Sequence, residues 1–577
     1  FVYLFACGML SLKLQKGDRV TLLSEGRNEW VMSELAVLYC GAVNVPVSVK
    51  IDELNDLKFR IAHSESKFVI VSQNHLEKIR KIKNDLPDLE KVIVLDNLTE
   101  KESDEITKDE ILFRGKEFLK SYKNEFDKIW QNINENDYAN ICYTSGTTAD
   151  PKGIILSHRN YTANVEQATA LLPIPEYYVS LLILPWDHSF AHTAGIYTLM
   201  KNGASMASVE VGKSQLESIK NIPNNIKEIK PHFLLSVPAL AKNFRKNIEK
   251  RIKGKGEKIE KLFEQALKIS YRYNAEGYNK GKGITKIYKP LLKLYDKILF
   301  SKIREQFGGR LEFFIGGGAL LDIELQKFFY ALGIPMLQGY GLSEAAPVIS
   351  ANVIAKHKLG SSGSVVKNLQ IKICDNDGKE LPIGEKGEIV VKGENVMLGY
   401  WKNESATKET LKDGWLYTGD MGYLDKDNFL YVLGRFKSLL IGSDGEKYSP
   451  EGIEEALTEH SQLIEQVMLH NNQNPFTVAL IVPNKELVIK KLEELGMSIK
   501  TADGQKEALK MIEREVNRFK SGGDLAGQFP ERWLPSTIAI LGEGFTEQNK
   551  FLNSTLKMVR GKITEFYQNR IDFLYTP

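Results

Sequence analysis

YTSGTTADPKG, residues Tyr143–Gly153, is the stretch of this 577-residue chain that decides how the rest is interpreted. Serine, threonine and glycine dominate it, so it has little apolar surface to bury and is not expected to serve packing. Its small residues allow backbone N–H groups to turn inward as an anion-binding nest, and its hydroxyls add donors. Lys152 brings a positive charge to the rim. The stretch therefore predicts a polyphosphate-binding loop rather than a flexible surface linker. It is not a Walker loop, because Gly153 follows the lysine where a Ser or Thr for magnesium would stand.

Strand-like and helix-like segments alternate around this loop. DRVTLLSE (Asp18–Glu25) has a strand pattern, and NEWVMSELAVLYCGA, which begins at Asn28, has a helix pattern that ends at Gly41. Further apolar runs of buried-strand type are Lys67–Ser72, Lys91–Asp96, Val179–Leu184, His232–Ser236 and Leu311–Ile315. This alternation predicts parallel sheets in an α/β architecture. For the large N-terminal domain we expect stacked mixed β-sheets flanked by helices.

The texture of the sequence changes in its last third. After about residue 361, glycines separate alternating strands such as GEIVVKG and NFLYVLG, which predicts a β-rich subdomain over 361–434. We place the domain boundary after Gly434, giving a large N-terminal domain, 1–434, and a small mobile α+β domain, 435–577. In SPEGIEEAL, which follows the boundary, Ser449 is predicted to be a helix N-cap.

Composition is that of an ordinary globular protein, with 42% hydrophobic and 26% charged residues. No run of 18 apolar residues occurs, so we expect no transmembrane helix. The four cysteines are scattered, with no CxxC pair, which favours buried thiols in a reducing compartment such as the cytoplasm over structural zinc or disulfides. The chain opens at Phe1 inside sequence that already has a folded pattern, and we expect further residues to precede it.

A basic insert lies between residues 242 and 304, with 19 Lys and Arg against 6 Asp and Glu. Leucine, isoleucine and phenylalanine recur in it at helical intervals. Two interpretations stay open: a solvated helical excursion packed on the main domain, and a surface that contacts anionic membranes peripherally. Nucleic acid is not expected as a partner, because no recognition module accompanies the charge.

Five further segments with glycine-rich or polar signatures follow the loop along the chain. They are LPWDHSFAHT (Leu184–Thr193), FIGGGALL (Phe314–Leu321), GYGLSE (Gly339–Glu344), WLYTGD (Trp415–Asp420) with the GRFK that follows it, and FLNSTLKMVRGK (Phe551–Lys562). Together with the loop, they resemble the signatures of the adenylate-forming enzymes, the superfamily of acyl-CoA synthetases, luciferases and peptide-synthetase adenylation domains. The last segment is similar to the form found in the long-chain fatty acyl-CoA synthetase branch. Ala149 stands where the family loop has its second glycine, and we expect it to change loop mobility rather than remove activity.

The resemblance implies a role for each matching residue. The residues that it assigns to ATP are Ser145, Gly146, Thr147, Thr148 and Lys152 at the phosphates, Gly317, Gly318 and Ala319 against adenine, Gly339, Tyr340, Gly341 and Ser343 around adenine and the α-phosphate, and Asp420 and Arg435 at the ribose. It assigns Mg²⁺ to Thr144 and Glu344 and places Lys437 at the hinge between domains. His188 would line the acyl pocket, with His192 as an additional candidate.

Catalysis, in this resemblance, depends on Lys557, Glu344 and Thr144. Lys557 would reach from the C-terminal domain to the carboxylate and the α-phosphate, and Gly561–Lys562 is the competing assignment. The lysine that the family carries four residues after the hinge is Ile441 here, so no role in the second half-reaction is transferred to that position.

The implied activity is an AMP-forming long-chain fatty acid–CoA ligase. ATP and coenzyme A would be its co-substrates and Mg²⁺ its metal ion. An acyl–acyl carrier protein synthetase is the closest enzymatic alternative, because an acidic carrier protein would also be attracted by the basic insert. A non-catalytic acyl- or nucleotide-binding relative is the alternative from another class. It is disfavoured by the retention of Lys152, Glu344, Asp420, Arg435 and Lys557.

Overall fold

The structure is a computed structural model, and it describes residues 1–144, 151–212, 215–318, 321–435, 438–443, 446–552 and 558–576. Contacts between Cα atoms divide the chain into two compact units. Within the described residues, the first comprises 1–144, 151–418 and 423–432, and the second comprises 419–422 and the part of the chain from residue 433 onward. The predicted α/β architecture of mixed sheets and helices, with a small C-terminal unit, is confirmed.

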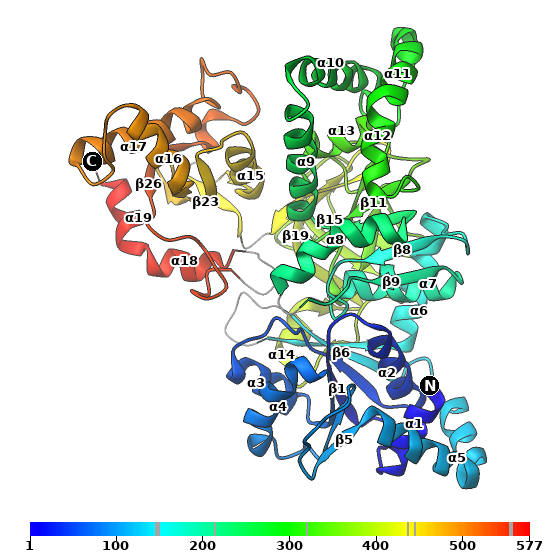
Figure 1. The fold of residues 1–577 in the computed structure, drawn as a ribbon. Helices are drawn as coiled ribbons and strands as arrows, with labels where there is room; N and C mark the ends of the chain where they lie inside the picture. The colour runs from blue at the N-terminus through cyan, green and yellow to red at the C-terminus, as the bar shows by residue number, and fades with distance from the viewer. Residues whose placement is uncertain are drawn as a thin grey trace. The chain divides into compact units, whose positions relative to one another are not determined.

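An eight-stranded sheet forms one layer of the first unit (Figure 1). Its strands, in spatial order, are β17 (Gly399–Tyr400), β7 (Gly153–Ser157), β6 (Tyr138–Tyr143), β2 (Val43–Pro46), β1 (Arg19–Leu23), β3 (Ser66–Val71), β4 (Lys91–Val94) and β5 (Glu105–Thr107). The strands from β6 to β5 are parallel to their neighbours, whereas β7 is antiparallel to both β6 and β17. Runs such as KFVIVS are nearly all buried here because helices cover parallel strands on both faces.

Helices follow the strands of this sheet as the alternating pattern predicts. They are α1 (Val2–Ser11), α2 (Asn28–Tyr39), α3 (Leu54–His63), α4 (Gln73–Ile82), α5 (Lys108–Gln131) and α6 (His158–Leu171). The helix expected to end at Gly41 is α2, and its last helical residue is Tyr39. Thr107 caps α5 through a reciprocal pair of hydrogen bonds with Glu110, and Ser157 caps α6 in the same way.

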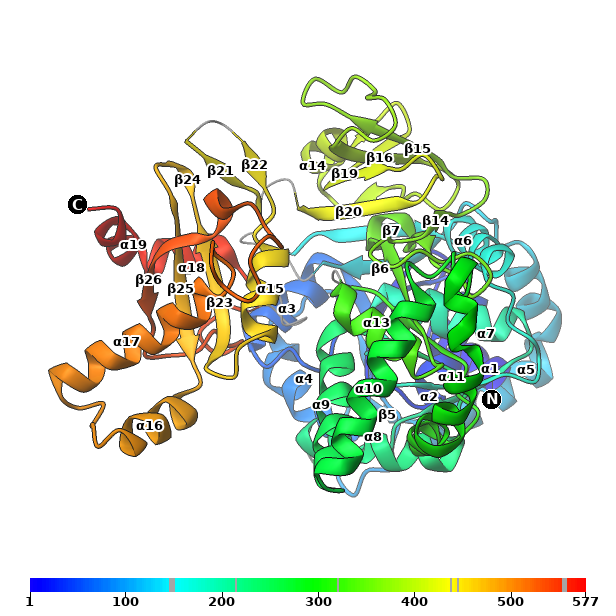
Figure 2. The same cartoon turned by 90° about the horizontal axis from the view of Figure 1, so that it is seen from above.

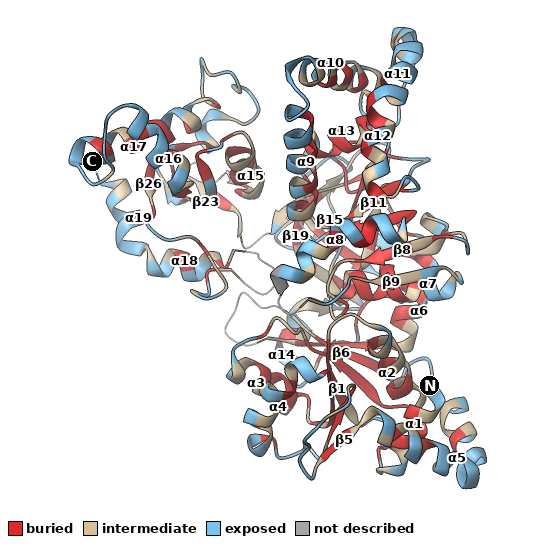
Figure 3. Ribbon diagram, in the orientation of Figure 1, coloured by how far each residue is buried: buried red, intermediate tan, exposed pale blue. Residues whose placement is uncertain are grey.

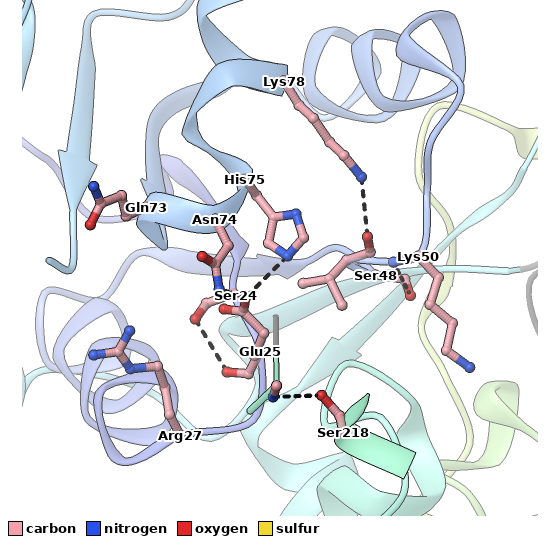
Figure 4. A network of polar contacts seen from close by, with 12 residues as sticks. Ser24, Glu25, Arg27, Ser48, Lys50, Gln73, Asn74, His75, Lys78 and Ser218 are labelled. Atoms are coloured by element: carbon pink, nitrogen blue, oxygen red, sulfur yellow. Dashed lines mark hydrogen bonds and ion pairs between the residues drawn. The ribbon is translucent and has the colours of Figure 1, made fainter. Parts of the chain in front are cut away.

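Polar side chains connect the loops at the carboxyl ends of β1 and β3 (Figure 4). Glu25 accepts a hydrogen bond from Asn74 Nδ2 at 2.7 Å, and His75 Nε2 lies 3.3 Å from the same carboxylate oxygen. Burial alone would raise the pKa of Glu25, but the hydrogen bonds from His75, Ser72 and Asn74 hold it well below its usual range. Glu25 therefore stays ionised and fastens the β1–α2 connection to the start of α4.

A seven-stranded sheet forms the second large layer of the first unit. Its order is β14 (Ser364–Val365), β13 (Val348–Ala351), β12 (Met336–Gly341), β11 (Phe313–Gly316), β10 (Phe233–Ser236), β8 (Val179–Leu182) and β9 (Ser205–Ser208). The strands from β9 to β12 are parallel, and β13 and β14 continue the sheet antiparallel. The strands predicted at Val179–Leu184, His232–Ser236 and Leu311–Ile315 are confirmed as β8, β10 and β11.

A smaller five-stranded sheet holds the glycine-punctuated strands of the last third. It comprises β15 (Gln370–Cys374), β16 (Gly387–Lys392), β19 (Trp415–Leu424), β18 (Leu411–Lys412) and β20 (Leu430–Arg435), which pairs with β19. In Figure 2, β15 and β16 stand apart from the helices α9, α10 and α11 of the basic insert. GEIVVKG and NFLYVLG correspond to β16 and β20.

The basic insert is helical and packs on the second sheet through a core of its own. Its elements are α9 (Pro238–Lys253), α10 (Glu257–Asn274), the 3₁₀ turn η3 (Gly283–Tyr288), α11 (Lys289–Tyr295), the π-helical turn η4 (Asp296–Phe300) and α12 (Ser301–Arg304). Phe263, Phe300 and Ile303 are buried in one apolar cluster with Phe314 of β11 and Phe328 of α13 (Ile323–Ala331). None of the helices in the described part of the chain has the length and apolar character needed to cross a membrane.

The second unit is built on two three-stranded sheets. One has the order β22 (Lys447–Tyr448), β21 (Leu440–Gly442), β24 (Asn472–Asn474), and the other β23 (Ile464–His470), β25 (Thr477–Pro483), β26 (Pro535–Ile540). Its helices are α15 (Glu451–Glu459), α16 (Lys485–Glu494), α17 (Ala502–Asn517), α18 (Arg560–Phe566) and α19 (Gln568–Tyr575). The prediction that Ser449 is the N-cap is wrong by one residue: Pro450 is the N-cap of α15, and the Ser449 hydroxyl instead contacts the Glu451 carboxylate.

Candidate active site

The two ends of the phosphate loop are held together by hydrogen bonds between Thr144 and Lys152. Thr144 N–H donates to the Lys152 carbonyl at 2.9 Å, and Lys152 N–H donates to Thr144 Oγ1 at 3.2 Å. These bonds extend the antiparallel pairing of β6 with β7 by one step, because Tyr143 already lies opposite Gly153. The loop between them is thus closed at its base, with Lys152 half-buried at one end.

Tyr400 connects Lys152 to Glu344. Lys152 Nζ lies 4.8 Å from the centre of the Tyr400 ring, a cation–π distance. The Tyr400 hydroxyl donates to Glu344 Oε1 at 2.9 Å. Both contacts follow from β17, whose pairing with β7 places Tyr400 opposite Ile154. A cation, an aromatic ring and a carboxylate therefore form one continuous chain of contacts within the first unit.

Glu344 lies in a short 3₁₀ turn, η6 (Ser343–Ala345), at the end of GYGLSE. Its backbone carbonyl accepts from Met397 N–H at 2.8 Å, so the segment that leads into β17 anchors both Glu344 and Tyr400. Leu342 is the N-cap of this turn and no side chain caps it, so Ser343 does not act as a helix cap. Instead, Ser343 Oγ lies 2.8 Å from Ser189 Oγ.

The Ser343–Ser189 contact joins GYGLSE to LPWDHSFAHT. His188 is half-buried, and its Nδ1 accepts from Phe190 N–H at 3.3 Å. Phe190 in turn lies against Gly317, where an added Cβ would come within 3.0 Å of the ring. His188, Ser343 and Gly317 are thereby brought into one neighbourhood of the first unit.

The glycines of GYGLSE and FIGGGALL allow close approach of backbone segments. Gly339, Tyr340 and Gly341 end β12, and a Cβ at Gly341 would lie 2.0 Å from the Pro347 carbonyl oxygen, so no side chain fits there. Gly318 has a φ of 81°, which a side-chain-bearing residue rarely adopts.

His192 belongs to the interior. Its side chain is fully buried, and Nε2 lies 2.9 Å from Glu34 Oε2. Glu34 also accepts from Asn44 Nδ2 and from the Tyr197 hydroxyl, each at 3.0 Å. The three donors satisfy a carboxylate that has no exposed surface, and we assign His192 to the core.

In the second unit, Asp420 and Arg435 form an ion pair. Arg435 Nε lies 3.4 Å from Asp420 Oδ1, and these residues come from the neighbouring strands β19 and β20. Asp420 is buried, whereas Arg435 is largely exposed. A buried carboxylate beside a guanidinium can accept hydrogen bonds from a diol such as ribose.

Several predicted site residues lie outside the described part of the chain. They are Ser145, Gly146, Thr147, Thr148, Ala319, Lys437 and Lys557, together with Ala149.

Tyr400 and Ser189 were missed by reasoning from sequence. Ser189 lies inside a quoted motif, but its contact with Ser343 joins positions 154 residues apart. Tyr400, in VMLGYW, follows no phosphate or metal pattern, and only the strand pairing with β7 reveals its position.

The residues around Glu344 fit a magnesium ion. Of the two carboxylate oxygens of Glu344, only Oε1 accepts a hydrogen bond from a residue that the structure describes. Oε2 is therefore available to a cation. Mg²⁺ typically takes one or two carboxylates and completes its shell with water and phosphate oxygens. The described residues include no cluster of three or more His, Cys, Asp or Glu side chains. The Thr144 hydroxyl is a further oxygen donor of the right kind.

Comparison with known proteins now identifies the chain's family. A family model described as AMP-binding enzyme matches residues 2–401, and one for the AMP-binding enzyme C-terminal domain matches residues 437–521. The chain belongs to the AMP-binding enzyme family. The predicted membership of the adenylate-forming superfamily is confirmed, and with it the general activity of an ATP-using, adenylate-forming acyl ligase.

Relatives of this AMP-binding enzyme include two acyl ligases. It is 28% identical to a long-chain-fatty-acid–[acyl-carrier-protein] ligase of Arabidopsis thaliana, over 99% of this chain and 81% of that one. It is 26% identical to the long-chain-fatty-acid–CoA ligase FadD15 of Mycobacterium bovis, over 99% of this chain and 90% of the relative. Among solved structures, the anthranilate CoA ligase AuaEII in complex with anthranoyl-AMP is similar in fold, with a TM-score of 0.71 at 19% identity, covering 99% of this chain and 91% of that one.

Proposed function

We propose that this AMP-binding enzyme is an AMP-forming long-chain fatty acid–CoA ligase. It would convert a fatty acid and ATP into acyl-AMP and pyrophosphate, and then transfer the acyl group to coenzyme A. The observation that carries the proposal is the contact chain from Lys152 through Tyr400 to Glu344. It supports the proposal because it ties the cation of a phosphate loop to a carboxylate with an available oxygen.

The first half-reaction makes a carboxylate reactive. A carboxylate is a poor electrophile because its negative charge repels nucleophiles. One of its oxygens attacks the α-phosphorus of ATP, the bond from that phosphorus to the bridging oxygen breaks, and pyrophosphate leaves with the electron pair. The work of the site is mainly positioning and charge neutralisation.

Each residue has a part in this step. Lys152 would hold the β- and γ-phosphates, and Lys557 would bring a positive charge to the carboxylate and α-phosphate. Bound Mg²⁺ would neutralise phosphate charge, and Thr144 and Glu344 are the residues that would hold it. Asp420 and Arg435 would hold the ribose.

The second half-reaction needs a thiol. Its sulfur attacks the carbonyl carbon of the acyl-adenylate, the bond to the phosphate oxygen breaks, and AMP leaves with the electron pair while the thiol proton is released. We further propose that the C-terminal domain turns about Lys437 between the two steps, which would withdraw Lys557 and admit the thiol.

Two lines support a fatty acid and coenzyme A as the substrates. The LNSTLKMVR form of the last motif is similar to that of long-chain fatty acyl-CoA synthetases, and FadD15 is named a long-chain-fatty-acid–CoA ligase. A carrier protein is the second candidate acceptor. It is favoured by the basic insert, with its balance of +13, which would attract an acidic protein, and by the named activity of the Arabidopsis relative.

An acceptor panel distinguishes these candidates. The enzyme is incubated with ATP, Mg²⁺ and acids of increasing chain length, with either coenzyme A or acyl carrier protein, and thioester formation is measured. We expect AMP release that depends on a long-chain acid, and thioester formation with coenzyme A. Thioester formed with carrier protein alone would transfer the proposal to the second acceptor, and no acid-dependent AMP release would refute both.

Lys557→Ala and Lys562→Ala form a matched pair for the last motif. Lys562 is exposed at the start of α18 and is the competing candidate for the catalytic lysine. We expect Lys557→Ala to abolish acid-dependent ATP–pyrophosphate exchange yet to allow transfer from preformed acyl-AMP, because the lysine serves only the first step. Lys562→Ala should exchange at the wild-type rate. The opposite pattern would assign the role to Lys562.

A further inference from the structure

The most exposed apolar surface of the basic insert is a stripe along η3, α11 and η4. Five aliphatic residues, here called the insert ridge, recur at intervals of three and four along this segment: Ile284, Ile287, Leu291, Leu294 and Ile298. All five are exposed, Ile284 to 87% and Ile287 to 73%. Intervals of three and four place side chains on one side of a helix. Figure 3 colours most of α11 as exposed.

The insert ridge is distinct from the face of this segment that packs in the core. A second stripe, on the same segment and on α12, already packs in the apolar cluster at the second sheet, and it comprises Leu292, Tyr295, Leu299 and Ile303. Turning the ridge inward would bring these side chains out into water, at the cost of the apolar area that they bury. The rotational position of the segment is therefore set by the buried stripe, and the ridge faces outward.

Lysines occupy the third side of the segment. Lys282, Lys286, Lys289, Lys293 and Lys297 are all exposed, again at intervals of three and four. None of them forms an ion pair with a residue that the structure describes. Between residues 278 and 303 there are seven lysines and a single acid, Asp296. That acid is bound to Arg304 at 2.6 Å, so it does not neutralise the lysines.

We propose that the insert ridge docks on the surface of an anionic lipid bilayer. Exposed aliphatic side chains beside a row of lysines are the pattern of a helix that lies in the membrane interface. The apolar chains enter the boundary of the acyl region, while the lysine stems extend their ammonium groups to the lipid phosphates. An anionic bilayer would therefore bury the apolar ridge and pair with the lysines at the same time.

Charge argues against a second copy of this chain as the occupant. A twofold symmetric dimer through the ridge would place the same patch on both subunits, so the lysine rows would face each other. Such like-charge contact is repulsive. An anionic lipid surface has the opposite sign and needs no complementary protein shape.

A small cleft continues this face. It has a volume of about 110 Å³, and its lining includes apolar side chains, among them Ile252 and Leu299. Ile298 of the ridge also lines it, as do the basic residues Arg251, Lys255 and Lys302. Sites for small-molecule ligands usually measure about 300 Å³ or more, so the cleft is too small to be one. It extends the same combination of apolar and basic groups from the ridge toward the end of α9.

Membrane docking would also suit the substrate. A long-chain fatty acid dissolves in bilayers, and an enzyme seated there would meet it at high local concentration. This consequence rests on the proposed function, whereas docking itself does not, and vesicle binding tests docking without any catalytic readout.

The test is sedimentation of the whole chain with vesicles of phosphatidylcholine alone and of phosphatidylcholine with phosphatidylserine. We expect binding to the anionic vesicles that weakens with added salt. A triple variant, Ile284→Gln, Ile287→Gln and Leu294→Gln, should reduce binding at least about tenfold, because three apolar side chains no longer enter the lipid. The matched control is Ile219→Gln, Ile383→Gln and Leu495→Gln, which alters three aliphatic residues that are more than half exposed elsewhere on the chain and should bind as the wild type does.

A second pair of variants separates charge from apolar contact. Lys286→Gln, Lys289→Gln and Lys293→Gln should weaken binding roughly 100-fold, since each lysine near an anionic surface contributes a factor of about five. Lys116→Gln, Lys123→Gln and Lys490→Gln remove the same charge from other exposed sites and should have little effect. Unchanged thermal melting of each variant confirms that it folds.

Three outcomes would overturn the proposal. The wild type could remain in the supernatant with anionic vesicles. The ridge variants could bind as their controls do. Lastly, sedimentation equilibrium could show a dimer that the ridge variant converts to a monomer without any vesicle binding, which would make the ridge an interface between copies.

Discussion

Tyr400→Phe removes one hydroxyl from the proposed site and little else. The hydroxyl donates to Glu344 Oε1 at 2.9 Å, while the ring contacts Lys152. Phenylalanine keeps a ring in the same place, so the cation–π contact is retained. The variant therefore isolates the hydrogen bond that positions Glu344.

The magnitude follows from the kind of bond that is lost. A hydrogen bond to a charged group contributes about 1.5 to 3 kcal/mol. If the bond holds Glu344 in the orientation needed for Mg²⁺ and ATP, losing it lowers the adenylation rate roughly 10- to 100-fold. Because Tyr400 acts through Glu344 and does not contact the reacting atoms in this scheme, we also expect the apparent affinity for Mg²⁺ to fall, so that part of the rate returns at high Mg²⁺.

The assay is acid-dependent ATP–pyrophosphate exchange, measured across a range of Mg²⁺ concentrations. Tyr138→Phe is the matched control, since Tyr138 is an exposed residue at the start of β6, at the end of that strand away from Thr144. Tyr400→Leu removes both the hydroxyl and the ring, and it should lose more activity than Tyr400→Phe because Lys152 also loses its contact. Exchange by Tyr400→Phe that equals the wild-type rate at every Mg²⁺ concentration would refute the positioning role.

Two further predictions concern stability and thiol chemistry. Glu34→Gln should lower the free energy of unfolding by about 2 to 4 kcal/mol in urea titrations, because an amide NH₂ would face donors that the buried carboxylate now satisfies. Glu117→Gln, at an exposed ion pair, should change the free energy of unfolding little. Equal losses in the two variants would contradict the argument. Burial raises the pKa of both Cys7 and Cys142 to about 12, so these groups stay protonated thiols at mildly alkaline pH and iodoacetamide should label the native chain slowly. All four cysteines should react quickly after denaturation, and rapid labelling of the native chain would show that the thiols are not buried.

Much of the fold was predictable because its strands are short, apolar and bounded by turn residues. KFVIVS and KVIVLD became β3 and β4, neighbouring parallel strands of the first sheet, as buried strands of an α/β fold should. The order of strands was not predictable. In the first sheet β1 lies between β2 and β3, and residue patterns carry no record of which strand a given strand will pair with.

Site residues that are close in sequence could be predicted. Site residues that meet only because distant strands pair could not. Thr144 and Lys152 close one loop within ten residues, so the motif already contains their relationship. Tyr400 reaches Glu344 only because β17 pairs with β7 across a gap of more than two hundred residues. Ser449 shows the smaller error, since a serine ahead of Pro-Glu has a capping pattern although proline itself takes the N-cap.

The basic insert contains two apolar stripes that its sequence alone does not distinguish. Apolar residues recur at intervals of three and four in two stripes, one starting at Ile284 and the other at Leu292. Periodicity alone treats the stripes as equivalent and would place either of them in a core. The structure distinguishes them, because the second stripe packs in the apolar cluster that includes Phe314 while Ile284 and Ile287 stay exposed. Once one stripe is committed to the core, the other cannot join it without displacing the first. The exposed ridge is therefore left for something outside the insert to cover, and the exposed lysines beside it are the reason that we propose an anionic surface.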